Sequence, residues 1–145
     1  MRSYIPLILC GALVAGCSTS AELGNPFGGS EQNAQLAAYA ASSHYPNQQP
    51  TGTMAISALV DRDRNDVELI NTTDKPISNA KVWLNGSYVT PLGTLPAHGT
   101  VKLSRNVFYD STGRSLGKSN TLITRVDLQT NDNNFYTLQG PAFRP

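Results

Sequence analysis

The chain has 145 residues, with 11 Lys and Arg against 10 Asp and Glu and a formal net charge of +1. This length suits one domain with appendages and is short for two domains. Because no basic excess is present to neutralise phosphates, we expect no nucleic-acid partner. Gly, Pro, Asn, Ser and Thr are plentiful, and this composition favours turns and short strands over helices.

The N-terminus has the parts of an export signal. Arg2 supplies positive charge, and residues 5–14 form an apolar run that is too short to span a bilayer comfortably. The run leads into Leu13-Val14-Ala15-Gly16-Cys17, in which a cysteine directly follows small residues. An ordinary secretory signal would instead end in a small-x-small cleavage site.

This ending closely resembles the lipobox of bacterial lipoproteins, a resemblance that covers the start of the chain as far as Cys17. It implies that residues 1–16 are a lipoprotein signal peptide and that Cys17 becomes a lipidated, usually N-acylated N-terminus that anchors the chain in a membrane. In that family Ser18 resembles the pattern for sorting to the outer membrane, facing the periplasm. Cys10 would leave with the signal, so we expect no disulfide in the exported domain.

Residues 17–53 lack strand alternation and are predicted to form a lipid-anchored tether. Within it, Glu31 to Ser42 is compatible with a short helix or with disorder, because its apolar face is thin. Ser30 is the candidate N-cap of such a helix. We favour a spacer that lifts the domain off the membrane. The alternative is that Leu36 and Tyr39 dock onto the domain and cover an apolar patch.

Residues 54–145 are predicted to form an all-β domain, an antiparallel β-sandwich of about seven short strands. Short apolar runs alternate here with turn signals, and no helical pattern separates them. The expected strands cover residues 54–60, 66–71, 77–84, 87–91, 100–104, 107–109, 122–129 and 135–138.

Near the end of the chain, the sequence predicts a strictly alternating strand and a tail that does not pair. In residues 122–129, strict alternation predicts that Leu122, Val126 and Leu128 face one way and that Arg125 and Asp127 face the other. The tail from Gly140 to Pro145 carries two prolines and is expected to end strand pairing.

The stretch from Asp66 to Leu103 resembles immunoglobulin-like and fibronectin type III-like bacterial modules. A strand ending in Asn71-Thr72-Thr73 is followed by a Leu-Pro-x-x-Gly corner at residues 95–99. The chain departs from antibody domains because no cysteine pair brackets Trp83. Its Trp-Leu-Asn-Gly-x-Tyr-Val hairpin also resembles small envelope lipoproteins of unknown function. These resemblances imply a fold and supply no activity.

The central hairpin carries the best candidate binding residues. Apolar residues flank Asn85-Gly86, which predicts a two-residue type I′ loop, since both central positions of that turn need positive φ. With this loop, Trp83 lies opposite Tyr88, and the two side chains share one face of the sheet.

Two interpretations of this aromatic pair stay open. Exposed, Trp83 and Tyr88 would form a platform for a glycan, a peptide or a protein partner, because Trp and Tyr are favoured in binding hot spots. We favour the alternative that another segment, such as the stretch with Leu36 and Tyr39 or Phe143, covers the pair, because large exposed apolar patches are uncommon.

The sequence carries no catalytic or metal-binding motif. Asp61, Asp63 and Asn65 have the spacing of calcium ligands, but Asp66 and Thr72 occupy the positions where such a loop needs Gly and Glu. No nucleophile elbow, Walker loop or His/Cys cluster is present. We therefore expect a solvated turn at residues 61–65, no metal and no cofactor.

The sequence thus predicts a non-catalytic, lipid-anchored envelope protein that acts as an interaction or structural module. Its expected partners are the membrane, through lipid on Cys17, and an envelope protein or glycan. One alternative is an assembly subunit of an envelope secretion machine. Another is a small glycan-binding module or hydrolase.

Overall fold

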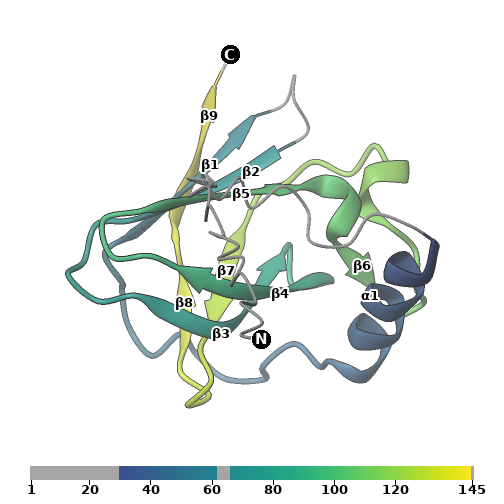
Figure 1. Cartoon of the computed structure of the whole chain (residues 1–145), viewed down its shortest axis with the longest axis horizontal. Helices are drawn as coiled ribbons and strands as arrows, with labels where there is room; N and C mark the ends of the chain where they lie inside the picture. The colour runs from purple at the N-terminus through teal and green to yellow at the C-terminus, as the bar shows by residue number, and fades with distance from the viewer. Residues whose placement is uncertain (1–29, 62–65, 145) are drawn as a thin grey trace, which may run out of the picture.

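The computed structural model describes residues 30–61 and 66–144, which form two packed β-sheets with one helix against the larger sheet (Figure 1). The four-stranded sheet has the order β5-β2-β1-β9, and the five-stranded sheet has the order β6-β4-β3-β7-β8. The strands are β1 (Ile56–Asp61), β2 (Asp66–Asn71), β3 (Ile77–Leu84), β4 (Tyr88–Leu95), β5 (Thr100–Ser104), β6 (Tyr109–Asp110), β7 (Val126–Gln129), β8 (Phe135–Thr137) and β9 (Gln139–Arg144). The predicted all-β sandwich is confirmed.

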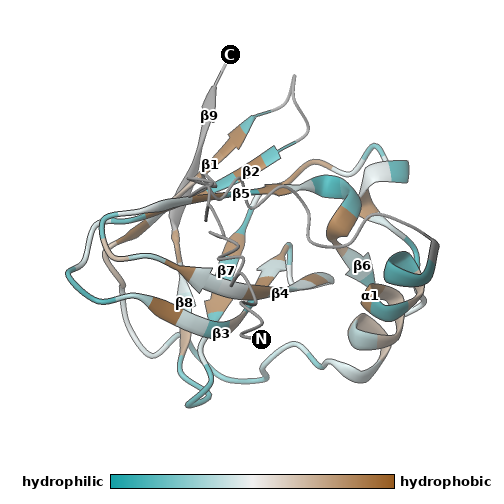
Figure 2. Cartoon of the chain, in the orientation of Figure 1, coloured by the Kyte–Doolittle hydropathy of each residue, from teal (hydrophilic) through white to brown (hydrophobic). Residues whose placement is uncertain are grey.

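Alternation explains why these segments form strands. In β2, Val67 and Leu69 are fully buried, whereas their neighbours are partly exposed. The period of two places one set of side chains between the sheets, where apolar area is removed from water. Figure 2 shows the resulting change from hydrophobic to hydrophilic along the strands. The core also contains Phe108, which directly follows the short 3₁₀ helix η1 (Arg105–Val107), and Leu116, the first residue of the 3₁₀ helix η2 (Leu116–Lys118).

The strand predicted over residues 122–129 begins only at Val126. Asn85, at the tip of the hairpin between β3 and β4, holds the preceding residues in an irregular loop. Its Nδ2 donates to the carbonyl of Leu122 (2.6 Å), and its Oδ1 accepts from the backbone N–H groups of Thr124 (2.8 Å) and Arg125 (3.1 Å). Backbone groups satisfied by this side chain are not available for a strand ladder.

The side chains at the start of this segment, residues 122 and 123, do not follow the predicted alternation between the two faces. Leu122, predicted to share a face with Val126 and Leu128, is 63% exposed, and Ile123 is buried instead. Within β7 itself the pattern holds, since Val126 and Leu128 belong to the sandwich core. Asp127 faces the opposite side, as predicted.

The C-terminal tail pairs with a strand, contrary to the prediction. β9 lies parallel to β1, with Ser57 aligned to Gln139 and Leu59 to Ala142, and the register shifts between these pairs. β9 is the last strand of its sheet. Proline is tolerated on an edge strand because its missing N–H can face away from the ladder, so Pro141 does not end the pairing.

The N-terminal residues of the described chain belong to the folded unit. Helix α1 (Ser30–Ser42) packs over β4 and β6. Its buried positions recur four residues apart and form one face, namely Gln32, Leu36 and Ala40, and Ser43 directly after the helix is also buried. The structure agrees with the alternative interpretation, that Leu36 and Tyr39 dock onto the domain and cover an apolar patch: Leu36 is buried, and Tyr39 is partly buried against the same cluster, so α1 is not a free spacer. Residues 1–29, and Cys17 with them, lie outside the described residues.

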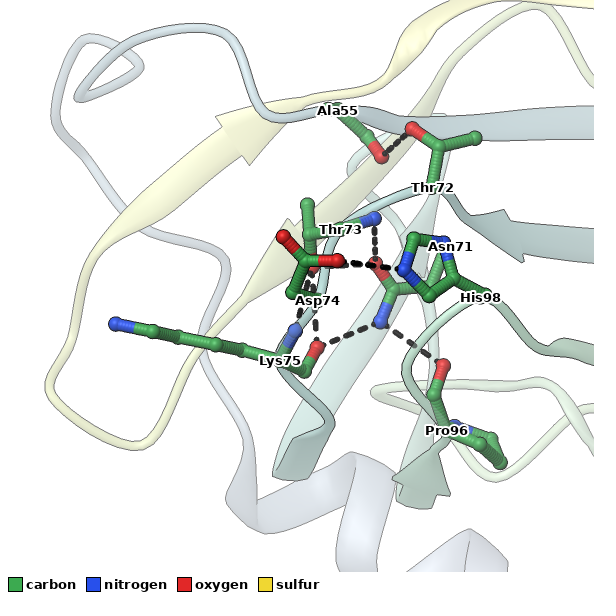
Figure 3. A network of polar contacts seen from close by, with 8 residues as sticks. All are labelled: Ala55, Asn71, Thr72, Thr73, Asp74, Lys75, Pro96 and His98. Carbon is green, nitrogen blue, oxygen red and sulfur yellow. Dashed lines mark hydrogen bonds and ion pairs between the residues drawn. The ribbon is translucent and has the colours of Figure 1, made fainter.

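A buried asparagine joins two turns at one end of the sandwich (Figure 3). Asn71 is 1% exposed. Its Nδ2 donates to the carbonyls of Lys75 (2.8 Å) and Pro96 (3.0 Å), and its Oδ1 accepts from the backbone N–H (3.0 Å) and hydroxyl (2.8 Å) of Thr73. This single amide satisfies backbone groups of the turns that follow β2 and β4. His98, in the second turn, pairs with Asp74 at the surface (2.7 Å), where such a pair adds little stability.

We predict that Asn71→Ala destabilises the fold by about 1–3 kcal/mol, because it removes the four hydrogen bonds of a buried amide and leaves the Thr73 N–H without its partner. Urea unfolding followed by circular dichroism measures this loss. The control is Thr72→Val, which removes one exposed hydroxyl bond to the carbonyl of Ala55 and should cost less. An Asn71→Ala protein that unfolds at the same urea concentration as the control would contradict the prediction.

Candidate functional site

The predicted register of the central hairpin is wrong by one residue. β3 and β4 align Trp83 with Val89 and Leu84 with Tyr88. A shift of one residue moves a side chain to the other face of a sheet. Trp83 and Tyr88 therefore lie on opposite faces and do not form an aromatic pair.

The turn chemistry explains both the correct and the incorrect part of the prediction. Asn85 and Gly86 have φ values of 53° and 68°, as a type I′ turn requires, and the Ser87 N–H donates to the carbonyl of Leu84 (3.1 Å). Ser87 is then an extra residue before the ladder resumes at Tyr88, which acts as a bulge. The dipeptide predicts the turn but contains no signal for this bulge.

Trp83 lies on the outer face of the five-stranded sheet and is covered. It is 3% exposed and packs with Leu36 and Ala40 of α1. Its indole N–H donates to Gln129 Oε1 (3.1 Å). Tyr88 is half-buried against the sandwich core on the other side. No open Trp83–Tyr88 platform exists, and the Phe143 side chain, named as a candidate cover, lies outside the described side chains.

After α1, an extended segment crosses the outer face of the five-stranded sheet and reaches the sheet edge at β8. We call residues 43–52 the strap. The Thr51 N–H donates to the carbonyl of Phe135 (2.6 Å), the Phe135 N–H donates to Thr51 Oγ1 (3.1 Å), and Gly52 forms a parallel bridge with Tyr136. Gln48 Nε2 donates to the carbonyl of Asn133 (3.0 Å). The strap thus pairs with the outer edge of β8, an edge that would otherwise present unpaired backbone groups.

The strap inserts one aromatic ring into the outer face. Tyr45 makes edge-to-face contacts with Trp83 (5.4 Å between ring centroids, 85°) and Phe135 (5.3 Å, 89°). The Arg125 guanidinium lies 5.8 Å from its ring centroid. A Cβ added to Gly86 would lie 3.3 Å from the Tyr45 ring, so the turn glycine leaves space for it. These groups surround the Tyr45 ring on several sides.

The hydroxyl of Tyr45 meets a buried carboxylate. It donates to Asp127 Oδ2 (2.9 Å), and Asp127 Oδ1 accepts from Arg125 Nε (2.9 Å) and Thr137 Oγ1 (2.8 Å). The Asp127 side chain is completely buried, whereas that of Arg125 is 44% exposed. A charge buried in this way is tolerated only with several partners. Burial, and then the hydrogen bond to Asp127, raise the pKa of Tyr45 to about 12. The same carboxylate raises the pKa of Arg125.

This arrangement can recognise a phenol. An aromatic slot fixes the ring, and a carboxylate accepts from the hydroxyl. Sequence reasoning missed Tyr45 because it is a single aromatic residue in a polar segment. It missed Asp127 as a site residue, although a charged residue within an apolar strand was a signal. Within residues 30–61 and 66–144, no cluster of three or more His, Cys, Asp or Glu side chains could hold a metal ion.

Comparisons of the chain with protein-family models, curated proteins and solved structures found no match in any of the three. No helix of the described residues is long and apolar enough to span a membrane. Function must therefore be argued from the residues of this chain.

We predict that Tyr45→Ala shifts the emission of Trp83, the only tryptophan, to the red and increases its quenching by acrylamide. The variant should lose about 2–4 kcal/mol of stability, because two ring contacts and a hydrogen bond disappear. Fluorescence and urea unfolding measure these changes. The control Tyr88→Phe alters the opposite face and should leave the emission unchanged; a shift in that variant and none in Tyr45→Ala would refute the register.

The Tyr45 hydrogen bond should also give a measurable pH dependence. The pKa of about 12 in the folded chain lies above the ordinary value of 10.0, so the neutral phenol is the form that folding favours. Its stabilisation is complete below pH 10 and is lost as the pH rises from 10 to 12. Urea unfolding across this range should show the stability difference between the native chain and Tyr45→Phe shrinking. A difference independent of pH would contradict the assigned hydrogen bond.

Proposed function

We propose that the chain is a lipid-anchored protein of the bacterial cell envelope that acts as a non-catalytic interaction or structural module. The observation that carries this proposal is Leu13-Val14-Ala15-Gly16-Cys17, placed after Arg2 and a short apolar run. Lipid on Cys17 would supply the anchor, since two or more acyl chains hold a protein stably whereas one chain is marginal. Ser18 favours an outer-membrane, periplasm-facing location.

The distance between the anchor and the fold supports a role close to the membrane. Cys17 lies 13 positions before Ser30, where α1 begins. An extended chain spans at most ~3.3–3.6 Å per residue, so this segment reaches at most about 45 Å. An anchored chain would hold the first residue of α1 within that reach of the bilayer.

The chemistry of the buried acids supports a binding role over catalysis. Burial tends to raise the pKa of Asp110, but hydrogen bonds from Thr112 and Arg114 outweigh it and hold the pKa below its usual value. The carboxylate of Asp127 is likewise occupied by Tyr45, Arg125 and Thr137. Asp110, with this lowered pKa, is not poised as a general acid or base, whose pKa would lie near the working pH, and the oxygens of Asp127 already have partners.

We predict that Cys17→Ser abolishes lipidation, whereas Cys10→Ser leaves it intact. Both cysteines precede the described residues, but only Cys17 occupies the lipobox position. The full-length gene is expressed in a Gram-negative host that is fed an alkyne-tagged fatty acid, and the label is read on the purified chain. Cell fractionation then shows whether the labelled chain is in the outer membrane. Equal labelling of the Cys17→Ser variant would refute the proposed anchor.

A further inference from the structure

The cover of the five-stranded sheet is held by contacts that need not come from the same chain. The cover consists of α1 and the strap, residues 30–52. The strap contacts β3, β7, β8 and the turn after β7. Its continuous link to the sandwich is the short connection of residues 53–55, which enters β1 in the other sheet. Every one of these contacts could be made to another copy.

The polar side chains of Trp83 and Asp127, which lie under the strap, have hydrogen-bond partners other than Tyr45. The Trp83 indole N–H is bonded to Gln129, and Asp127 retains Arg125 and Thr137. Departure of the cover therefore exposes aromatic and apolar surface. It removes the phenol hydrogen bond of Asp127, the two hydrogen bonds between Thr51 and Phe135 and the bond from Gln48 to Asn133, but it leaves no unpaired buried charge. Strongly destabilising losses arise when a buried charge loses its only partner, and that condition is absent here.

The edge of β8 can accept an extended segment. Thr51 and Gly52 already pair with it as a short added strand, and Tyr45 fills the adjacent slot. Addition of a strand to an exposed edge, with a side chain in a pocket, is a recurring mode of peptide recognition. The segment that fits this slot is present in every copy of the chain, so reciprocal exchange forms a closed two-fold pair without any new contact.

We propose that α1 and the strap are an exchangeable cover, and that the outer face of the five-stranded sheet binds the same cover from a second copy of this chain. Within one chain the short link gives the cover an effective concentration of about millimolar, so exchange requires crowding of copies. A shared membrane surface would supply that crowding, a point that rests on the proposed anchor. The exchange itself does not require lipid and is tested without it.

The test uses two differently tagged full-length chains in detergent, each with Cys10 and Cys17 changed to serine. The donor carries Gly52→Cys and the acceptor carries Tyr136→Cys. These residues are bridge partners, and a Cβ added to Gly52 meets no atom within 4 Å. Under an added oxidant, a donor–acceptor disulfide forms efficiently only when the donor strap lies on the acceptor sheet. Its yield should rise with protein concentration.

A collision control separates exchange from random encounter. An acceptor with Leu122→Cys, at an exposed loop position, reports disulfides formed by collision. Exchange predicts a yield severalfold above this control, and a yield equal to it overturns the proposal. An excess of a synthetic peptide with the sequence of residues 43–52 should compete and lower the yield.

The peptide competitor shows whether the acceptor slot recognises Tyr45. A peptide of residues 43–52 with Tyr45→Ala lacks the side chain that the slot holds and should compete at least about tenfold less well than the native peptide, the change that ~1.4 kcal/mol of binding produces. Circular dichroism checks that each cysteine variant is folded. Equal competition by the two peptides overturns the proposal, whatever the lipidation result.

Discussion

The completely buried carboxylate of Asp127 is the constraint on which the outer half of the structure depends. Removal of a charge from water costs several kcal/mol, and partners must offset this cost. Arg125 comes from the loop before β7, Thr137 from β8 and Tyr45 from the strap. The carboxylate therefore joins the β7–β8 region to the strap, which lies 82 residues earlier in the sequence. It also explains why residues 43–52 follow one path across the sheet although they are mostly polar.

At the ends of the sandwich, side-chain amides link separate segments of the chain, a role that disulfides have in many exported domains. The sequence contains no cysteine after Cys17, so no disulfide can form within the described residues. Asn71 instead ties together the turns after β2 and β4, and Asn85 ties the central hairpin to the loop before β7. Each amide satisfies both carbonyl and N–H groups of the backbone, which is the requirement that irregular segments must meet in a folded protein.

The sequence pattern predicted the strands whose bounds are set by their own residues and by the turns beside them. The bounds of β2, β3 and β5 follow from alternation and turn residues, because apolar side chains of each strand pack against the core between the sheets. The failures have long-range causes. The bulge at Ser87 shifts the hairpin register, Asn85 captures the loop that was predicted as strand, and the pairing of Pro141 depends on an edge position. The site was missed for the same reason, since the slot around Tyr45 is assembled from β3, β7 and β8 and has no local sequence signal.

The position of the cover in the chain couples two properties of the proposed anchored protein. The cover lies between Cys17 and β1, so its release would expose the aromatic face and also add residues 30–52 to the linker that precedes β1. In the closed form the anchor segment reaches at most about 45 Å from Cys17 to α1, and each released residue can add up to ~3.3–3.6 Å when extended. Opening would therefore let the sandwich search a larger distance from the membrane while its binding face is exposed. A second copy that captures the cover would end both changes together, because the same contacts close the face and shorten the linker.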